Sequence, residues 1–270
     1  MKTIQRPPEP PTLLAFRSAT PDASWNDARA ARISEDVFLA LARAQGYLCA
    51  YCEIDIEPGP FGQVDHFVPK SLANADQRLH LDFQNMLAVC EGGARPDLEG
   101  LKPGRSLPPV RATSHCGQRK GEVSPRGRVL DPAAEIPASA RLWSVDELTG
   151  GITVDAIACA AEGVDPALAG ATIETLGLDL PGLRRMRRAV IDALDDAWLV
   201  AIRALDDPDD ADWARERILV AADHLLPGED GRLLPFWTTV RSWAGPEIEP
   251  FIAGHAGQIP GLLAQRGAHS

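Results

Sequence analysis

Four cysteines constrain this chain most strongly, because their spacing can place four thiolates around one ion. Cys49-Ala50-Tyr51-Cys52 forms a C-x-x-C pair, and Cys90 and Cys116 each lie in a polar stretch rich in turn residues. Four thiolates can close a tetrahedral Zn²⁺ site, and such an ion stabilises a segment that has little core of its own. A C-x-x-C pair is also compatible with redox chemistry, and Cys90 and Cys116 with unrelated free thiols.

Length and composition indicate a globular protein. The chain has 270 residues, of which 45% are hydrophobic and 24% charged, so it can bury a core without disulfides. No apolar run approaches the roughly 18–20 residues of a membrane span. The first residues are broken by prolines and lack the apolar segment of a signal peptide. We therefore expect a soluble, cytoplasmic protein without membrane association.

The net charge of −11 is divided unevenly along the chain. Residues 1–130 have a net charge of +1, whereas residues 131–270 have a net charge of −12. Within residues 95–128, eight lysines and arginines stand against three acidic residues. Such a basic segment can contact phosphate although the whole protein is anionic. A solvated loop without any ligand is the alternative interpretation.

The hydrophobic pattern predicts different structures in the two halves. An irregular arm is expected over residues 1–30, followed by a helix that begins near Ser34, a β-hairpin within residues 47–70 and a long loop over 91–128. In the second half, apolar residues recur every three to four positions after Pro181, which predicts one long amphipathic helix. A further helix is expected between Trp213 and Leu226. Cys159 is expected to be an ordinary buried thiol.

One short segment combines an acid and a base. In Val64-Asp65-His66-Phe67, the carboxylate can hold a divalent metal while the imidazole takes a proton from water. Taken alone, the pair is more typical of a surface Asp-His at the end of a strand than of a catalytic site.

The order of the motifs resembles the HNH endonuclease family. The resemblance is carried by C-x-x-C at 49–52, V-D-H-F-x-P-K-S at 64–71, D-F-Q-N-M-L at 82–87, Cys90, and Cys116-x-x-x-Lys120-Gly121. More narrowly, the chain is similar to the HNH subunits (PtuB) of Septu anti-phage systems and to retron-associated HNH nucleases. This narrower resemblance extends to residues 171–184 and to the proline-rich start.

The resemblance implies an α+β fold in which a ββα-metal module with structural zinc precedes a mainly α-helical region. The implied division is an N-terminal arm at 1–30 that could dock a partner, an HNH nuclease domain at 31–130, and an acidic helical region at 131–270. Cys49, Cys52, Cys90 and Cys116 would bind the zinc. His66 would be the general base, Asp65 would ligate a catalytic Mg²⁺ or Mn²⁺, and Asn85 would hold the motif loop and the His66 ring.

The chain departs from the family pattern at two places. Many HNH proteins carry a His or Asn directly after the last zinc cysteine, as second ligand of the catalytic ion, but here that residue is Gly117. His115 and Gln118 are the nearest replacements, and both remain open. The second departure is the 25-residue interval between Cys90 and Cys116, which is expected to contact DNA. The expected nucleic-acid contacts are Lys70, Arg105, Arg111, Arg119 and Lys120.

The sequence leaves three functions to consider. The favoured one is a metal-dependent DNA endonuclease, acting as the effector of a bacterial anti-phage defence complex that an ATPase subunit (PtuA-like) gates. The alternative is a zinc-stabilised nucleic-acid-binding protein that has lost cleavage, which Gly117 favours. A C-x-x-C redox protein is the third reading, against which tight zinc retention would count.

Overall fold

The computed structural model describes residues 1–56, 62–72, 79–93, 113–138, 140–205 and 212–262. Its helices and strands are α1 (Pro11–Ala19), α2 (Trp25–Ala30), α3 (Ile33–Ala44), β1 (Gly62–His66), β2 (Met86–Cys90), α5 (Cys116–Lys120), β3 (Trp143–Val145), β4 (Ile152–Val154), α6 (Ala156–Ala161), α7 (Pro166–Leu176), α8 (Pro181–Arg203), α9 (Trp213–Leu225), α10 (Trp237–Ala244) and α11 (Glu249–His255). The protein is therefore a mixed α and β structure with small sheets, as the α+β expectation requires at this coarse level.

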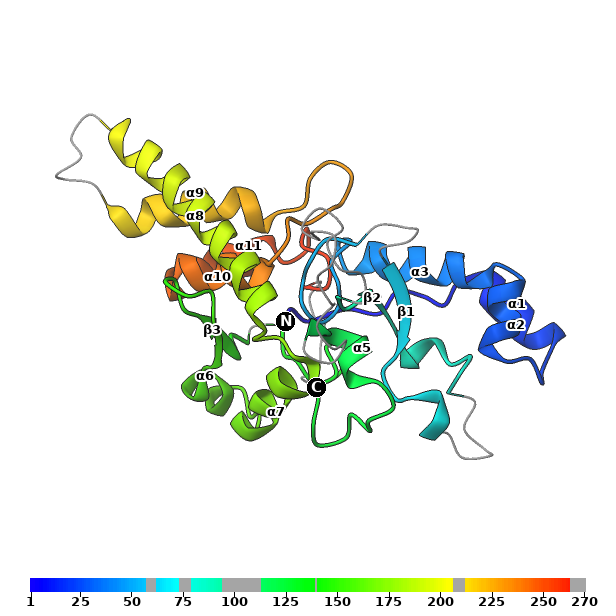
Figure 1. Cartoon of the computed structure of the whole chain (residues 1–270). Helices are drawn as coiled ribbons and strands as arrows, with labels where there is room; N and C mark the ends of the chain where they lie inside the picture. The colour runs from blue at the N-terminus through cyan, green and yellow to red at the C-terminus, as the bar shows by residue number, and fades with distance from the viewer. Residues whose placement is uncertain (57–61, 73–78, 94–112, 139, 206–211, 263–270) are drawn as a thin grey trace, which may run out of the picture.

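The sheet that positions the Asp65-His66 pair is antiparallel and has two strands, β1 and β2. Its register places Asp65 opposite Leu87 and His66 opposite Met86. All five residues of β2 are buried, because α3 and α5 both pack against this strand. In Figure 1 the two strands lie below α3, with α1 and α2 (dark blue) on one side and the projecting α8–α9 hairpin (yellow) on the other.

The first 44 residues are more regular than expected. The prediction of an irregular arm is wrong for α1 and α2, since Pro11 occupies the first turn of α1, where a missing N–H costs nothing. A capping box closes the start of α2, in which the side chains of Ser24 and Asp27 satisfy each other's backbone N–H groups. The helix expected near Ser34 is α3, which begins at Ile33.

The hairpin predicted within residues 47–70 is wrong in its strand partner. Strand β1 pairs with β2, about twenty residues further along the chain, and Leu48 forms only an isolated bridge with Asp55. The cause is burial: β2 is a continuous apolar strand that must lie inside the core, and it covers one edge of β1. Residues 57–61 of the predicted hairpin lie outside the described residues, and so do residues 94–112 of the predicted long loop.

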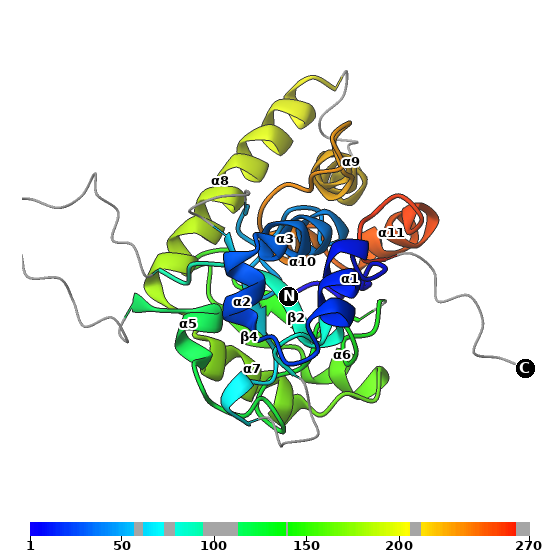
Figure 2. The ribbon, with the colours of Figure 1, turned by 90° about the vertical axis from the view of Figure 1, so that its right-hand side faces the viewer.

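The two helices predicted from periodicity are confirmed as α8 and α9. Figure 2 shows α8 rising along one side of the molecule, while α9 and α10 lie beside it. Cys159 is fully buried, as expected, and its thiol donates to the carbonyl of Leu142. Among the described residues, no helix is both long enough and apolar enough to cross a membrane.

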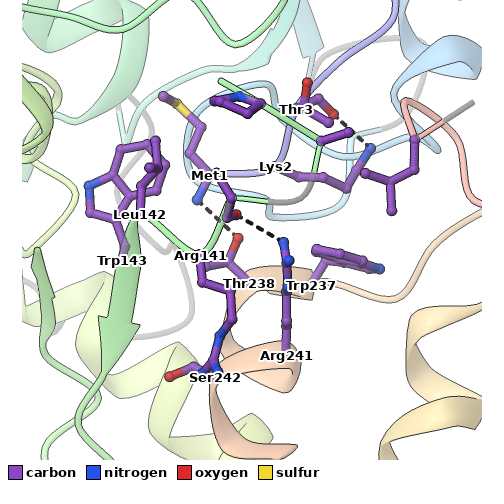
Figure 3. Close-up of a pocket in the computed structure, with 14 residues that line it drawn as sticks. Met1, Lys2, Thr3, Arg141, Leu142, Trp143, Trp237, Thr238, Arg241 and Ser242 are labelled. Carbon is purple, nitrogen blue, oxygen red and sulfur yellow. Dashed lines mark hydrogen bonds between the residues drawn. The ribbon is translucent and has the colours of Figure 1, made fainter. Parts of the chain in front are cut away.

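The two halves share one core at the start of the chain. The amino group of Met1 is buried, donates to Oγ1 of Thr238 at 3.0 Å and pairs with Glu53 at 3.2 Å. Met1 lines a small cavity, and Figure 3 shows it beside Leu142 and Trp143, which belong to the second half of the chain. Because Glu53 directly follows Cys52, this junction joins the cysteine turn to α10.

Candidate metal centre and catalytic site

The four cysteines converge on one buried point. Cys49 and Cys52 lie in the turn after α3, Cys90 ends β2 and Cys116 begins α5. Their Sγ atoms all lie within 4.8 Å of one another. The distance is 3.8 Å from Cys49 to Cys116 and 3.7 Å from Cys52 to Cys90. Tetrahedral Zn–S bonds of about 2.3 Å would set sulfurs about 3.8 Å apart, so the arrangement fits zinc.

The four thiols of the cluster influence one another's protonation. Burial raises the pKa of the Cys52 and Cys116 thiols, because charge is unfavourable away from water. Hydrogen bonds from the neighbouring thiols, that of Cys116 foremost, lower the pKa of Cys90. A metal ion would replace these shared protons, as thiolate ligands require. Four converging thiols differ from the isolated dithiol that a C-x-x-C redox site presents.

His115 belongs to this cluster. Its Nδ1 lies 3.1 Å from Sγ of Cys116 and 3.8 Å from Sγ of Cys90. A ring N–H beside a metal thiolate orients the ligand and stabilises its charge. Of the two replacements considered for the ligand at Gly117, His115 is therefore engaged with the cysteines, whereas the side chain of Gln118 is exposed on α5.

Asp65 lies on β1 and is held by two donors. The Tyr51 hydroxyl donates to its Oδ2 at 2.7 Å, and the Lys120 ammonium lies 3.1 Å from the same oxygen. Burial raises the pKa of Asp65, and the positive charge of Lys120 opposes this rise. Neither partner of Asp65 was predicted from the sequence. A signal for Lys120 was present, since it follows Cys116 by one helical turn and so shares its face of α5.

His66 ends β1 and is enclosed on two sides. Its Nε2 lies 3.0 Å from the carbonyl oxygen of His80, and its ring meets the edge of Trp25 with centroids 5.1 Å apart. A carbonyl only accepts hydrogen bonds, so Nε2 carries the proton and Nδ1 keeps the lone pair of a base. Burial lowers the pKa of His66 to about 4. Nothing in the sequence indicated that Trp25 would reach the ring.

Asn85 closes the loop that follows His66. Its Nδ2 donates to the carbonyls of Val68 and Leu79 at 2.9 and 3.1 Å, and its Oδ1 accepts from the N–H of Val68 at 2.8 Å. These contacts are the ones expected of a residue that holds the motif loop. The His66 ring itself is held by His80 and Trp25.

The residues expected to contact nucleic acid lie in different settings. Lys70 is exposed near the end of the V-D-H-F-x-P-K-S motif. The Nε of Arg119 donates to the carbonyl of Glu174, where α5 meets α7. Lys120 is only 1% exposed, so its ammonium lies behind Asp65 and not on the surface. Arg105 and Arg111 lie outside the described residues.

Comparison with known proteins gives one informative match. An Escherichia coli protein named "Retron Ec83 putative HNH endonuclease" is 27% identical to this chain, over 71% of this chain and 79% of its own length. This similarity supports the HNH family. No family model matches the chain, and no solved structure matches it.

Proposed function

We propose that the protein is a metal-dependent HNH endonuclease that hydrolyses phosphodiester bonds in DNA. The observation that carries this proposal is the end of β1, where a carboxylate and an enclosed neutral imidazole stand side by side. The antiparallel strands β1 and β2 and the helix α5 surround this pair. The four clustered thiols belong to the same strands and helix and to the turn before them. The similarity to a protein named as an HNH endonuclease agrees with this reading.

The residues present suit two metal ions of different character. Cys49, Cys52, Cys90 and Cys116 would hold Zn²⁺, since thiolates select it, whereas the hard carboxylate of Asp65 would hold Mg²⁺ or Mn²⁺. A bound Mg²⁺ supplies positive charge that stabilises the extra negative charge of the phosphate in the transition state.

His66 does the proton transfer in this proposal. Its Nδ1 takes a proton from water as the water oxygen attacks phosphorus, and the bond from phosphorus to the 3′ oxygen breaks. The products are a 5′ phosphate and a 3′ hydroxyl, whose proton comes from solvent. The hydrogen bond from Nε2 to His80 keeps the ring in the tautomer that this step needs.

A nicking assay tests the proposal. Supercoiled plasmid is incubated with the full chain and Mg²⁺ or Mn²⁺, beside the variant His66→Ala and a sample containing EDTA. Nicking by the wild type alone supports the assignment of His66. Nicking that persists in His66→Ala would contradict it.

A binding protein without cleavage is the second candidate, and one observation favours it. Oδ2 of Asp65 is already paired with Lys120, which leaves fewer oxygens for a metal ion than an unpaired carboxylate offers. If the protein slows the migration of plasmid in a gel but does not nick it under any metal condition, this candidate is supported.

The finer proposal is that the nuclease acts in an anti-phage complex gated by an ATPase. It rests on the resemblance to Septu subunits and on the word retron in the name of the E. coli relative. Truncating the first residues would be a poor test of docking, because Met1, Ile4 and Leu13 belong to the core. Leu14→Glu is better, since this side chain is exposed on α1. Loss of co-purification with the ATPase, with zinc content unchanged, is the expected result.

A further inference from the structure

We infer that Gly117 provides the space that the Asp65 carboxylate requires, and that Tyr51 and Lys120 position this carboxylate so that Oδ1 can reach a divalent ion. The inference rests on the proposed function and names three positioning residues of the same site. It gives the departure from the family pattern at Gly117 a physical meaning other than a lost ligand.

The two oxygens of Asp65 have different surroundings. Oδ2 accepts from Tyr51 at 2.7 Å and pairs with Lys120 at 3.1 Å. Oδ1 takes part in neither contact and faces α5, where a Cβ atom on Gly117 would lie 3.0 Å from it. One oxygen is thus anchored, and the other is directed to the surface of the helix.

The backbone of Gly117 does not itself call for glycine. This residue lies in α5 and is not among the glycines with positive φ, so an alanine could adopt its conformation. Glycine is a poor helix former, and without another demand alanine would suit the position better. That demand comes from Asp65, because a Cβ atom added at Gly117 would lie 3.0 Å from its Oδ1 and 3.1 Å from its Cγ.

The contacts of Lys120 are those of a structural clamp. Its ammonium meets three acceptors: Oδ2 of Asp65 and the carbonyls of His66 and Phe67, the latter two at 2.7 and 2.9 Å. An ammonium has three hydrogens, so all of them are used. Lys120 therefore ties α5, the helix that begins at Cys116, to both residues of the Asp65-His66 pair. A phosphate contact would require it to abandon these acceptors.

The test is Mn²⁺ affinity, measured by electron paramagnetic resonance on the full, zinc-loaded chain. We expect Gly117→Ala, Gly117→Asn and Lys120→Met each to weaken Mn²⁺ binding by about tenfold or more, the range typical when support of a metal ligand is lost. Gly182→Ala is the matched control. It also adds a methyl group to a helical glycine, but no atom lies within 4 Å of the added Cβ, so its Mn²⁺ affinity should equal that of the wild type.

The outcomes separate the two proposals. Gly117→Ala that binds Mn²⁺ as tightly as the wild type, or Gly117→Asn that binds it more tightly, would overturn the inference while the proposed function stands. Mn²⁺ binding that Asp65→Asn leaves unchanged would overturn the proposed function and the inference together. Zinc content and circular dichroism show which variants have kept their fold. Gly117→Ala keeps the test decisive if Lys120→Met does not fold.

Discussion

Two regions of this chain are held together by different kinds of contact. The cysteine module, which we define as the described part of residues 47–121, is built from β1, β2 and α5, each of five residues. Beside the buried apolar residues of β2, it contains four converging thiols and buried polar groups such as Lys120. The helical region, the described part of residues 131–270, contains the 23-residue α8 and is held by apolar side chains packed between helices. The comparison teaches that the converging thiols and the Asp65-His66 pair lie among short strands and helices, which polar contacts such as the Asp65–Lys120 pair help to hold in place.

Removing zinc should have the largest effect and should fall on one region. Structural zinc contributes on the order of 10–16 kcal/mol in small zinc modules. We expect Cys90→Ser to lose zinc and to expose the backbone of the cysteine module, while α8 keeps most of its protection in hydrogen exchange. Cys159→Ala is the control, since this thiol lies outside the cluster. Equal loss of protection in both regions would show that they fold as one unit.

His66→Ala should strongly slow cleavage without changing the structure of the cysteine module or of the helical region. A positioned general base accelerates a reaction by about 10²- to 10⁴-fold, so the nicking rate should fall by that factor. Zinc content and thermal midpoint should stay close to those of the wild type. A variant that loses zinc as well would show that the base also supports the cysteine module.

The pH dependence of the wild type follows from the same residue. The pKa of His66 is lowered to about 4 from an ordinary value near 6.5. The neutral base therefore prevails at every pH above about 4, and single-turnover cleavage should not fall between pH 7.5 and pH 5.5. A decline centred near pH 6.5 would mean that the His66 ring is solvated in the working enzyme.

A core truncation in α8 should destabilise the helical region and leave zinc bound, the opposite of the result expected from zinc removal. Leu194 is fully buried, so Leu194→Ala should lower the free energy of unfolding by about 2–5 kcal/mol in urea denaturation. Val200→Ala on the same helix is the control, because Val200 is 66% exposed. We expect zinc to remain bound to the folded variant. Zinc release at native conditions would break the comparison.

The smallest expected effect concerns the helix that joins the regions. Asp165 caps α7, its Oδ1 accepting from the N–H of Ala167, and α7 packs on α5. Asp165→Ala should lower the free energy of unfolding by about 1 kcal/mol. Asp223→Ala, at an exposed position in the last turn of α9, should change it by less than about half of that. A larger loss for Asp165→Ala, together with weaker Mn²⁺ binding, would show that α7 supports the site through α5.

Local patterns in the sequence determined part of this protein. Four cysteines at ligand spacing predicted the cluster, and a period of three to four residues predicted α8 and α9, because each pattern reflects one element or one ligand set. The Asp65-His66 pair was likewise visible as adjacent residues. Contacts between residues that are far apart in the sequence leave no such local pattern.

Only the tertiary structure decided which residues surround the Asp65-His66 pair. It paired β1 with β2 in place of a local hairpin, brought Trp25 onto the ring of His66, and buried Lys120 against Asp65. These contacts join residues up to 55 positions apart (Asp65 and Lys120), and their energies depend on burial that exists only after folding. The same reason applies to the inferred role of Gly117, because a Cβ atom at this position would lie 3.0 Å from Oδ1 of Asp65, which belongs to a distant part of the chain.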